Sequence, residues 1–229
     1  MVTRGVRDWP VVGGDMFDRA QALTTTPGVN GWTVKDTSSA GTPTYLCITE
    51  DGGAMKLTLV STSEEEVVTM YQNDVLPLDL ANLQRVEFVA KVAGIDAVTT
   101  LTMGVANAQN DTEDSVAVNA WFRMEGSVST TLVVCEADDG TSDLDDKATG
   151  IALSSTYKKF VIDFSNGLSD IRFFIDGERV AAATTFTLSS ITAGQNVQPF
   201  IQLHKASGTG VPSVTIACYL AVYRYAYGA

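Results

Sequence analysis

Hydrophobic and polar positions alternate with a period of two along much of the chain, and this pattern predicts β-strands. The clearest example lies in residues 157–187. Residues 160–164 and 171–175 each place an aromatic or aliphatic side chain at every second position. Asp176 and Gly177 follow the second run, and an Asp-Gly pair favours the positive φ angles of a two-residue turn. The segment therefore predicts a β-hairpin that turns at Asp176-Gly177.

Similar short runs recur from residue 31 to the end of the chain and predict an all-β fold. About a dozen of them are separated by turn-forming residues at the spacing of a sandwich. We find no internal repeat and no long helical pattern, so the fold class is an antiparallel β-sandwich or jelly roll. The predicted strands include residues 44–49 and 55–60 around a second hairpin turn at residues 50–53, and residues 67–72, 85–94, 98–107, 116–126, 130–137, 198–208 and 213–228.

The first 31 residues lack a sustained period and predict an irregular N-terminal arm, followed by one β-sandwich domain over residues 32–229. Arms of this kind either dock on a neighbouring subunit or lie as a strap across their own domain with their aromatic side chains in the core. The basic side chains of the arm suit an acidic partner surface. The candidate contact residues are Arg4, Arg7, Trp9, Phe17 and Arg19.

The last predicted strand is rich in tyrosine, and simple alternation divides its side chains between two faces. One face would carry Ile216, Cys218, Leu220 and Val222. The other would carry Tyr219, Tyr223, Tyr225 and Tyr227. Both faces of this strand are therefore expected to be covered, one by the core and the other by the arm, a loop or another subunit.

Composition narrows the possible environments and partners. With 229 residues, of which 45% are hydrophobic, the chain can bury a large core. The formal net charge of -12 argues against binding to nucleic acids or to an anionic membrane surface. The N-terminal segment lacks the apolar core of a secretory signal, so synthesis in the cytosol is expected. Cys47, Cys135 and Cys218 are too few for a disulfide framework and are expected to be free core residues.

Residues 136–146 form the most acidic segment and are predicted to be a loop. Clustered carboxylates are the ligands that Ca²⁺ prefers, although the spacing matches no EF-hand. The alternative is a solvated loop whose charges repel one another. The candidate ligands are Asp138, Asp139, Asp143 and Asp145, with Asp146 beside them, and no other cofactor is expected.

Catalytic motifs are absent from the sequence. The run Glu64 to Glu66 places consecutive carboxylates on alternate faces of a strand, whereas glycoside hydrolysis needs two carboxylates across one sugar. The single histidine, His204, has no accompanying nucleophile motif. Trp121 could form a carbohydrate platform with Asn119 and Arg123 on the same predicted strand, but aromatic residues in a sandwich also serve as core.

Residues 83–224 resemble the concanavalin A-like lectin/glucanase (laminin-G-like) jelly roll. The resemblance lies in the strand at 86–88, the strand at 157–163, the aromatic hairpin at 171–181 and the strand at 199–205. Glucanases of that family carry a Glu-x-Asp-x-x-Glu strand, and this spacing is absent here. The resemblance therefore implies the fold without implying an enzyme.

The whole chain also resembles virion structural proteins of tailed bacteriophages that use this sandwich. The shared features are the arm with Gly-Asp-Met-Phe-Asp, the Asn30-Gly31-Trp32 sequence, an acidic body rich in Thr, Ser and Ala, and a hydrophobic final strand. This resemblance implies a non-enzymatic decoration protein that binds the major capsid protein or other virion subunits. It would lie on the capsid surface as a homo-oligomer, with a trimer favoured. The alternative is a carbohydrate-binding module of a phage appendage or cell surface.

Overall fold

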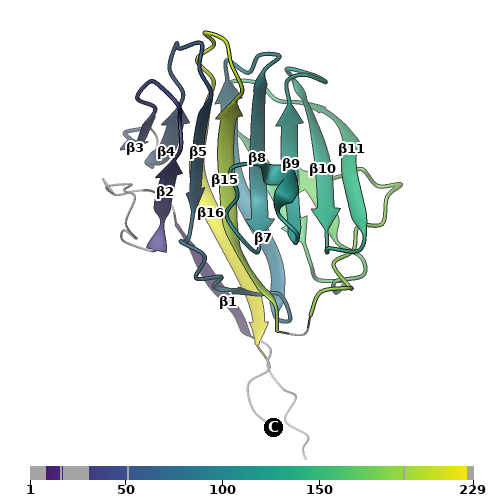
Figure 1. Cartoon of the computed structure of the whole chain (residues 1–229). Coiled ribbons are helices and arrows are strands. Elements are labelled where there is room, and N and C mark those ends of the chain that lie inside the picture. Colours follow the sequence, from purple (N-terminus) through teal and green to yellow (C-terminus); the bar gives the residue numbers. More distant parts are fainter. Residues whose placement is uncertain (1–8, 16, 18–30, 51, 193, 226–229) are drawn as a thin grey trace, which may run out of the picture.

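The computed structural model describes residues 9–15, 17, 31–50, 52–192 and 194–225, and these form two antiparallel β-sheets stacked face to face (Figure 1). The predicted all-β sandwich is confirmed. Within these residues Glu113–Ser115 form a 3₁₀ turn, Gly31 also has 3₁₀ conformation, and no α-helix is present. No helix in this described part has the length and apolarity needed to span a membrane.

The first sheet, called sheet A here, is built around the last strand of the chain. Its strand order is β14-β13-β12-β7-β16-β4-β3, and β1 also pairs with β16. The strands of this path are β3 (Thr44–Ile48), β4 (Ala54–Thr58), β7 (Leu83–Ala93), β12 (Lys158–Asp163), β13 (Arg172–Ile175), β14 (Glu178–Val180) and β16 (Ser213–Tyr225).

The second sheet, sheet B, faces the viewer in Figure 1 and has the order β11-β10-β9-β8-β15-β5-β2. A short strand, β6 (Leu78–Asp79), pairs with the start of β15. The strands of the main path are β2 (Thr33–Asp36), β5 (Glu66–Tyr71), β8 (Thr99–Ala106), β9 (Asn119–Glu125), β10 (Leu132–Asp138), β11 (Asp143–Ala152) and β15 (Asn196–Lys205).

The core lies between the two sheets and is joined across them by aromatic side chains. Phe122 of sheet B packs edge-on against Phe160 and Phe173 of sheet A, with 5.1 Å between ring centroids in each pair. Phe173 also meets Phe186 at 4.7 Å. Such pairs contribute about 0.5–1.5 kcal/mol each beyond the area that they bury. The alternating aromatic residues of 160–175 therefore stabilise the contact between the sheets.

The predicted hairpin at Asp176-Gly177 is confirmed, and it joins β13 to β14. Asp176 and Gly177 have φ angles of 52° and 86°, which is the pair of positive values that a type I′ turn requires. The Asp176 carboxylate accepts a hydrogen bond from the backbone N–H of Lys159 at 2.8 Å and pairs with the Lys158 ammonium at 2.8 Å. The turn is thereby anchored to the neighbouring strand β12.

We expect Gly177→Ala to lower the free energy of unfolding by about 1–2 kcal/mol, because a Cβ is disfavoured at positive φ. A Cβ at this position would meet no atom within 4 Å, so the cost would come from the backbone alone. Urea denaturation would measure the change. Gly13→Ala is the matched control, since its Cβ would also be unobstructed but its φ lies outside the positive range. Equal stability of the two variants would contradict the argument.

The predicted irregular arm is partly wrong, because its described residues include a strand. β1 (Trp9–Asp15) pairs antiparallel with the second half of β16. Phe17 is buried with its ring 5.9 Å from that of Trp32. The part of the arm that is described therefore packs on its own domain, as the strap alternative anticipated. Arg4, Arg7 and Arg19 lie outside the described residues, and for Trp9 only the backbone is described.

The predicted division of β16 into a tyrosine face and an aliphatic face is wrong for Ile216, which lies on the same side as Tyr219. The pairing of β16 with β7 shifts register between Ile216 and Cys218, which marks a β-bulge. One extra residue reverses the parity of every side chain that follows it. Tyr219 consequently joins Ile216 in the core, with its ring 5.4 Å from that of Trp32. Tyr227 lies outside the described residues.

A buried ion pair closes one end of sheet B. Lys205 at the end of β15 and Glu66 at the start of β5 are both fully buried, with 2.6 Å between Nζ and the Glu66 carboxylate. The Lys205 ammonium also donates to the carbonyl oxygens of Val60, Thr62 and Gly210. The Glu66 carboxylate accepts from the backbone N–H of Val60 at 3.2 Å. The pair thus fastens two loops to the ends of adjacent strands.

Cys47, Cys135 and Cys218, all of them among the described residues, form no disulfide bond, as predicted. Cys135 is buried in the core, and burial raises the pKa of its thiol far above the ordinary value. A thiol in that state is a poor nucleophile. Cys135 therefore acts as a small hydrophobic residue of β10.

Candidate functional site

The outer face of sheet B is covered by the loop of residues 107–118, which crosses in front of β8 and β9 and carries the 3₁₀ turn (Figure 1). Beneath this loop Val116 packs with Trp121 and Phe200, whose rings are 5.7 Å apart. Trp121 is fully buried, and Asn119 beside it is also buried. Trp121 therefore has no exposed face, and its interpretation as a carbohydrate platform is wrong for this structure.

Gly104 explains how a tryptophan fits under the loop. It lies opposite Trp121 in the pairing of β8 with β9. A Cβ on Gly104 would come within 2.5 Å of the Trp121 Cα and Cβ atoms. The absence of a side chain at Gly104 therefore leaves the space that the Trp121 side chain needs to lie against the sheet.

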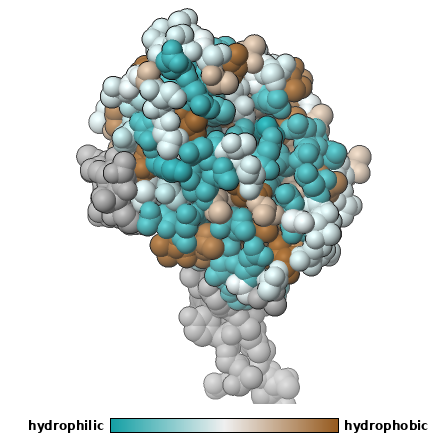
Figure 2. Space-filling view, in the orientation of Figure 1, coloured by the Kyte–Doolittle hydropathy of each residue, from teal (hydrophilic) through white to brown (hydrophobic). Residues whose placement is uncertain are grey.

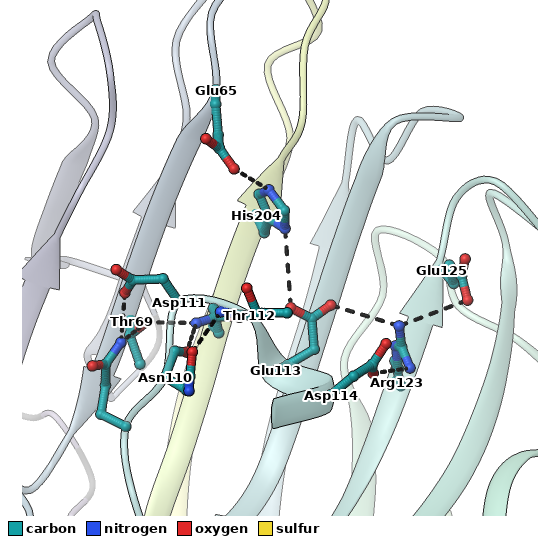
Figure 3. A network of polar contacts seen from close by, with 12 residues as sticks. Glu65, Thr69, Asn110, Asp111, Thr112, Glu113, Asp114, Arg123, Glu125 and His204 are labelled. Carbon is teal, nitrogen blue, oxygen red and sulfur yellow. Dashed lines mark hydrogen bonds and ion pairs between the residues drawn. The ribbon is translucent and has the colours of Figure 1, made fainter. Parts of the chain in front are cut away.

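Arg123 is the centre of a buried charge cluster on the same face, shown in part in Figure 3. Its guanidinium lies 2.7 Å from the Asp114 carboxylate, 3.3 Å from Glu136, 3.6 Å from Glu113 and 3.8 Å from Glu125. Burial opposes the charge on the guanidinium, but the surrounding carboxylates outweigh it and raise the pKa of Arg123. Two of these partners, Glu113 and Asp114, belong to the 107–118 loop, so the Arg123 cluster holds the loop on the sheet.

Glu136 is the group in this cluster whose pKa is most perturbed. Burial raises its pKa to about 7, while the Trp121 indole and Arg123 act in the opposite direction. The indole nitrogen does not reach hydrogen-bonding geometry. A carboxyl with this pKa would suit general acid catalysis, but the Glu136 side chain is only 3% exposed and pairs with Arg123. A substrate cannot reach Glu136 in this arrangement. The role of the Arg123 cluster is therefore structural.

His204 of β15 lies between the 107–118 loop and Glu65, the residue that precedes β5 (Figure 3). Its Nε2 atom lies 3.2 Å from the Glu65 carboxylate, and its Nδ1 atom lies 4.0 Å from that of Glu113. The opposite end of the loop is attached through Lys35, whose ammonium donates to Gln109 at 2.8 Å and pairs with Asp111 at 3.1 Å. The 107–118 loop is therefore held by polar contacts at both ends. Figure 2 shows this side of the molecule as largely hydrophilic.

The acidic segment 136–146 is not the single loop that the sequence predicted. It contains the end of β10, a turn and the start of β11. Asp139 accepts hydrogen bonds from the backbone N–H groups of Ser142 at 2.7 Å and Ser190 at 2.9 Å, and Asp138 accepts from that of Gly140. A hydrogen bond to Asp143 raises the pKa of Asp145. Across the described residues no three acidic, His or Cys side chains are grouped to hold a metal ion, so the structure gives no support to the calcium alternative for Asp138, Asp139, Asp143 and Asp145.

The outer face of sheet A carries an open groove of about 450 Å³. Its apolar part comes from Val161, Phe174 and Val222. Its polar part includes Gln84, Arg85, Asp163, Ser165 and Arg224. Phe174 and Val161 are half-buried, so part of each side chain remains accessible.

The groove residues lie on adjacent, hydrogen-bonded strands, and several of them are direct cross-strand partners. Phe174 of β13 lies opposite Val161 of β12, and Asp163 of β12 lies opposite Arg85 of β7. Arg85 in turn lies opposite Val222 of β16. The sequence alternation already assigned Phe173 to the core side and Phe174 to the other side, but it gave no indication that four strands would bring these outward side chains together. The groove is therefore a site that sequence reasoning missed.

Comparison with known proteins gives a match at the level of structure. No family model matches the sequence, and no curated protein matches it. A protein of unknown function from Shewanella oneidensis MR-1 superposes with a TM-score of 0.62 at 9% identity, covering 100% of this chain and 92% of that one. The catalytic domain of an endo-1,3-β-glucanase (laminarinase) from Thermotoga petrophila RKU-1 superposes with a TM-score of 0.60 at 12% identity, covering 97% of this chain and 100% of that one.

A carbohydrate recognition domain, that of Emp47p, gives a TM-score of 0.54 at 12% identity and covers 90% of this chain and 95% of that one. The fold is the concanavalin A-like lectin/glucanase jelly roll. The predicted resemblance is thus confirmed for the concanavalin A-like fold. Because this fold occurs both in a glucanase and in a carbohydrate recognition domain, it does not by itself assign an activity.

Proposed function

We propose that this concanavalin A-like protein is a non-enzymatic carbohydrate-binding module that holds a glycan in the sheet A groove. The observation that carries the proposal is the composition of the groove, where the half-buried ring of Phe174 lies among planar hydrogen-bonding groups. An aromatic or aliphatic surface suits the C–H face of a sugar ring. Convergent polar groups such as Gln84, Arg85 and Asp163 suit its hydroxyl groups.

The dimensions and rigidity of the groove support the same proposal. Its volume of about 450 Å³ falls in the range of small-molecule sites and suits a short glycan segment. Apart from Ser165, which follows β12, its side chains come from the paired strands β7, β12, β13 and β16. Side chains on paired strands are held more firmly than side chains on loops, so less entropy is lost when a ligand binds.

The arrangement of carboxylates argues for binding without hydrolysis. Glycoside hydrolysis uses two carboxyl groups placed about 5–10 Å apart across one sugar. Among the described residues that line the groove, Asp163 is the single carboxylate. The carboxylates that do gather, Glu113, Asp114, Glu125 and Glu136, surround Arg123 on the opposite sheet. The groove thus supplies one carboxylate, and the carboxylates around Arg123 are engaged with its guanidinium, which supports binding over hydrolysis.

The test is a glycan array followed by titration calorimetry with the glycans that bind. We expect Phe174→Ala to weaken binding by about tenfold, because it removes the ring that a sugar would pack against. Leu46→Ala is the matched control, since Leu46 is an exposed apolar residue of the same sheet on strand β3, away from the groove residues. An array with no bound glycan, or equal affinity of Phe174→Ala and wild type, would contradict the proposal.

The capsid-decoration function stays a prediction, as do the trimer and the location on a virion. Of the residues proposed to contact a capsid, Phe17 is buried in the protein's own core, and β1 pairs with β16. The three arginines of the arm lie outside the described residues. Glycan binding is supported by a groove that is already formed in the structure, and for that reason we favour it over capsid decoration.

A further inference from the structure

Charge is distributed unequally between the two sheets. In the seven-strand path of sheet A, the basic residues are Lys56, Arg85, Lys91, Lys158, Lys159, Arg172, Arg179 and Arg224, and the acidic residues are Glu87, Asp163 and Glu178. In the seven-strand path of sheet B, the basic residues are Lys35, Arg123, Lys147 and Lys205. The acidic residues there are Asp36, Glu66, Glu125, Glu136, Asp138, Asp143, Asp145 and Asp146. Carboxylates of the adjoining turns, Glu50, Asp170 and Asp176, pair with Lys91, Arg172 and Lys158. Sheet A still keeps a small excess of basic residues in a protein whose net charge is -12.

The groove lies on this basic sheet, and the carboxylates near it are already engaged. Glu87 pairs with both Arg85 and Lys159. Burial works against ionisation of Glu87, but these two cations outweigh it and lower its pKa. Asp170 pairs with Arg172 next to the groove. Asp163 accepts a hydrogen bond from the backbone N–H of Ser165 at 2.9 Å. Among the residues that line the groove or lie beside it, four cations (Arg85, Lys159, Arg172 and Arg224) stand against three carboxylates (Glu87, Asp163 and Asp170), so the groove keeps a net positive charge.

Arg85 is the residue best placed to contact an anion. Its side chain is 46% exposed, and it contributes to the groove. Its Nε atom is held by Glu87, which fixes the plane of the guanidinium. The two terminal nitrogens have no partner among the described residues, and Arg224 lines the same groove. A guanidinium oriented in this way can form two parallel hydrogen bonds to a planar or tetrahedral oxyanion.

We propose that the groove selects an anionic glycan, with Arg85 as the bidentate partner of a carboxylate or sulfate group on the sugar. This inference rests on the proposed carbohydrate-binding function and adds the class of glycan. The acidic sheet B would repel a polyanion, whereas the basic sheet A would attract it. The glycan therefore approaches through sheet A, with Phe174 packing against a sugar ring and Arg85 binding the anionic group.

Titration calorimetry with three oligosaccharides of equal length tests the proposal: a neutral β-1,3-glucan, an oligogalacturonide that carries carboxylates, and a chondroitin sulfate oligosaccharide. We expect at least one anionic glycan to bind about tenfold or more tightly than the neutral one, and its affinity to fall as salt increases. The two anionic probes show whether a carboxylate alone is sufficient or a sulfate is needed.

Arg85→Gln should remove the preference for the anionic glycan, and Arg85→Lys should restore only part of it because a lysine cannot form the bidentate contact. Lys56→Gln removes the same charge from β4 of the same sheet, away from the groove residues, and should leave affinity unchanged. Thermal unfolding of each variant checks that the fold persists. Glu87 keeps Lys159 as a partner in the Arg85 variants.

The possible failures are distinguishable. If neutral and anionic glycans bind equally and Arg85→Gln has no effect, the anionic inference is overturned while the carbohydrate-binding function stands. If no oligosaccharide binds, both are overturned. If an oligoglutamate of the same charge binds as tightly as the glycans in an Arg85-dependent manner, a glycan is not the specific occupant and the groove recognises acidic protein segments instead.

Discussion

Replacing Lys205 by alanine is expected to lower the free energy of unfolding by about 3–5 kcal/mol. The substitution leaves the fully buried Glu66 carboxylate without its cation. It also removes the hydrogen bonds to the carbonyl oxygens of Val60, Thr62 and Gly210. The loss follows mainly from an uncompensated charge in an apolar environment, because desolvation of a lone buried ion is costly. Guanidinium denaturation at neutral pH would measure it.

The double variant Lys205→Met with Glu66→Leu is the control that separates charge from packing. Replacing both members of a buried ion pair by apolar residues of similar volume is often neutral or stabilising. We therefore expect the double variant to be much more stable than Lys205→Ala. A loss of less than about 1 kcal/mol in Lys205→Ala would mean that the Glu66 carboxylate finds another partner.

The second large effect concerns pH and Glu136. The pKa of this carboxyl is about 7 in the folded protein, against an ordinary value of 4.5, because of burial. The folded state therefore binds more protons than the unfolded state between these two values, and stability falls as pH rises through this window. The contribution is complete below about pH 4.5 and lost above about pH 7, and it amounts to something on the order of 3 kcal/mol.

Glu136→Gln should abolish this pH dependence, so the variant should gain stability relative to wild type as pH rises from 5 to 8. Urea denaturation at the two pH values gives the difference directly. The pKa values of Asp145 and Asp146 are also raised, by a hydrogen bond to Asp143 and by burial respectively, and for that reason the comparison between variant and wild type is the informative quantity. Glu64→Gln changes an exposed residue and serves as the matched control. A variant with an unchanged pH slope would show that Glu136 is ionised at little cost.

Alternation along the sequence predicted most of the fold. It located β12 and β13, whose inward residues include Phe160 and Phe173, and it placed the hairpin turn at Asp176-Gly177. These segments were predictable because their apolar positions repeat strictly and because few residue pairs suit a type I′ turn. The jelly-roll resemblance rested on the same segments, and the structural comparisons confirm that fold.

Two features escaped prediction because local sequence patterns do not encode them. β11 (Asp143–Ala152) is an edge strand made largely of acidic and small residues, so it lacks the apolar alternation that marks a strand. The β-bulge after Ile216 adds one residue to β16, and it is recognised only from the pairing of β16 with β7, not from the sequence. Alternation therefore placed Ile216 and Tyr219 on opposite faces, whereas both lie in the core.

The candidate site was predicted less well than the fold, because it depends on contacts between distant segments. Trp121 was chosen as an exposed platform, but its burial depends on the 107–118 loop, which folds over it. The groove on sheet A needs β7, β12, β13 and β16, which are separated by long stretches of chain. Neither arrangement can be inferred from the alternation within any single strand.

The position of β16 in the middle of sheet A has a consequence for how the protein folds. β16 follows every other strand along the chain, yet it pairs with β7 on one side and with both β4 and β1 on the other. Sheet A therefore cannot be completed by a ribosome-bound chain until this segment has emerged. Contacts between residues so far apart in sequence slow folding and leave strand edges unpaired in the meantime. For this protein, we expect aggregation to compete with folding mainly in the interval before β16 inserts.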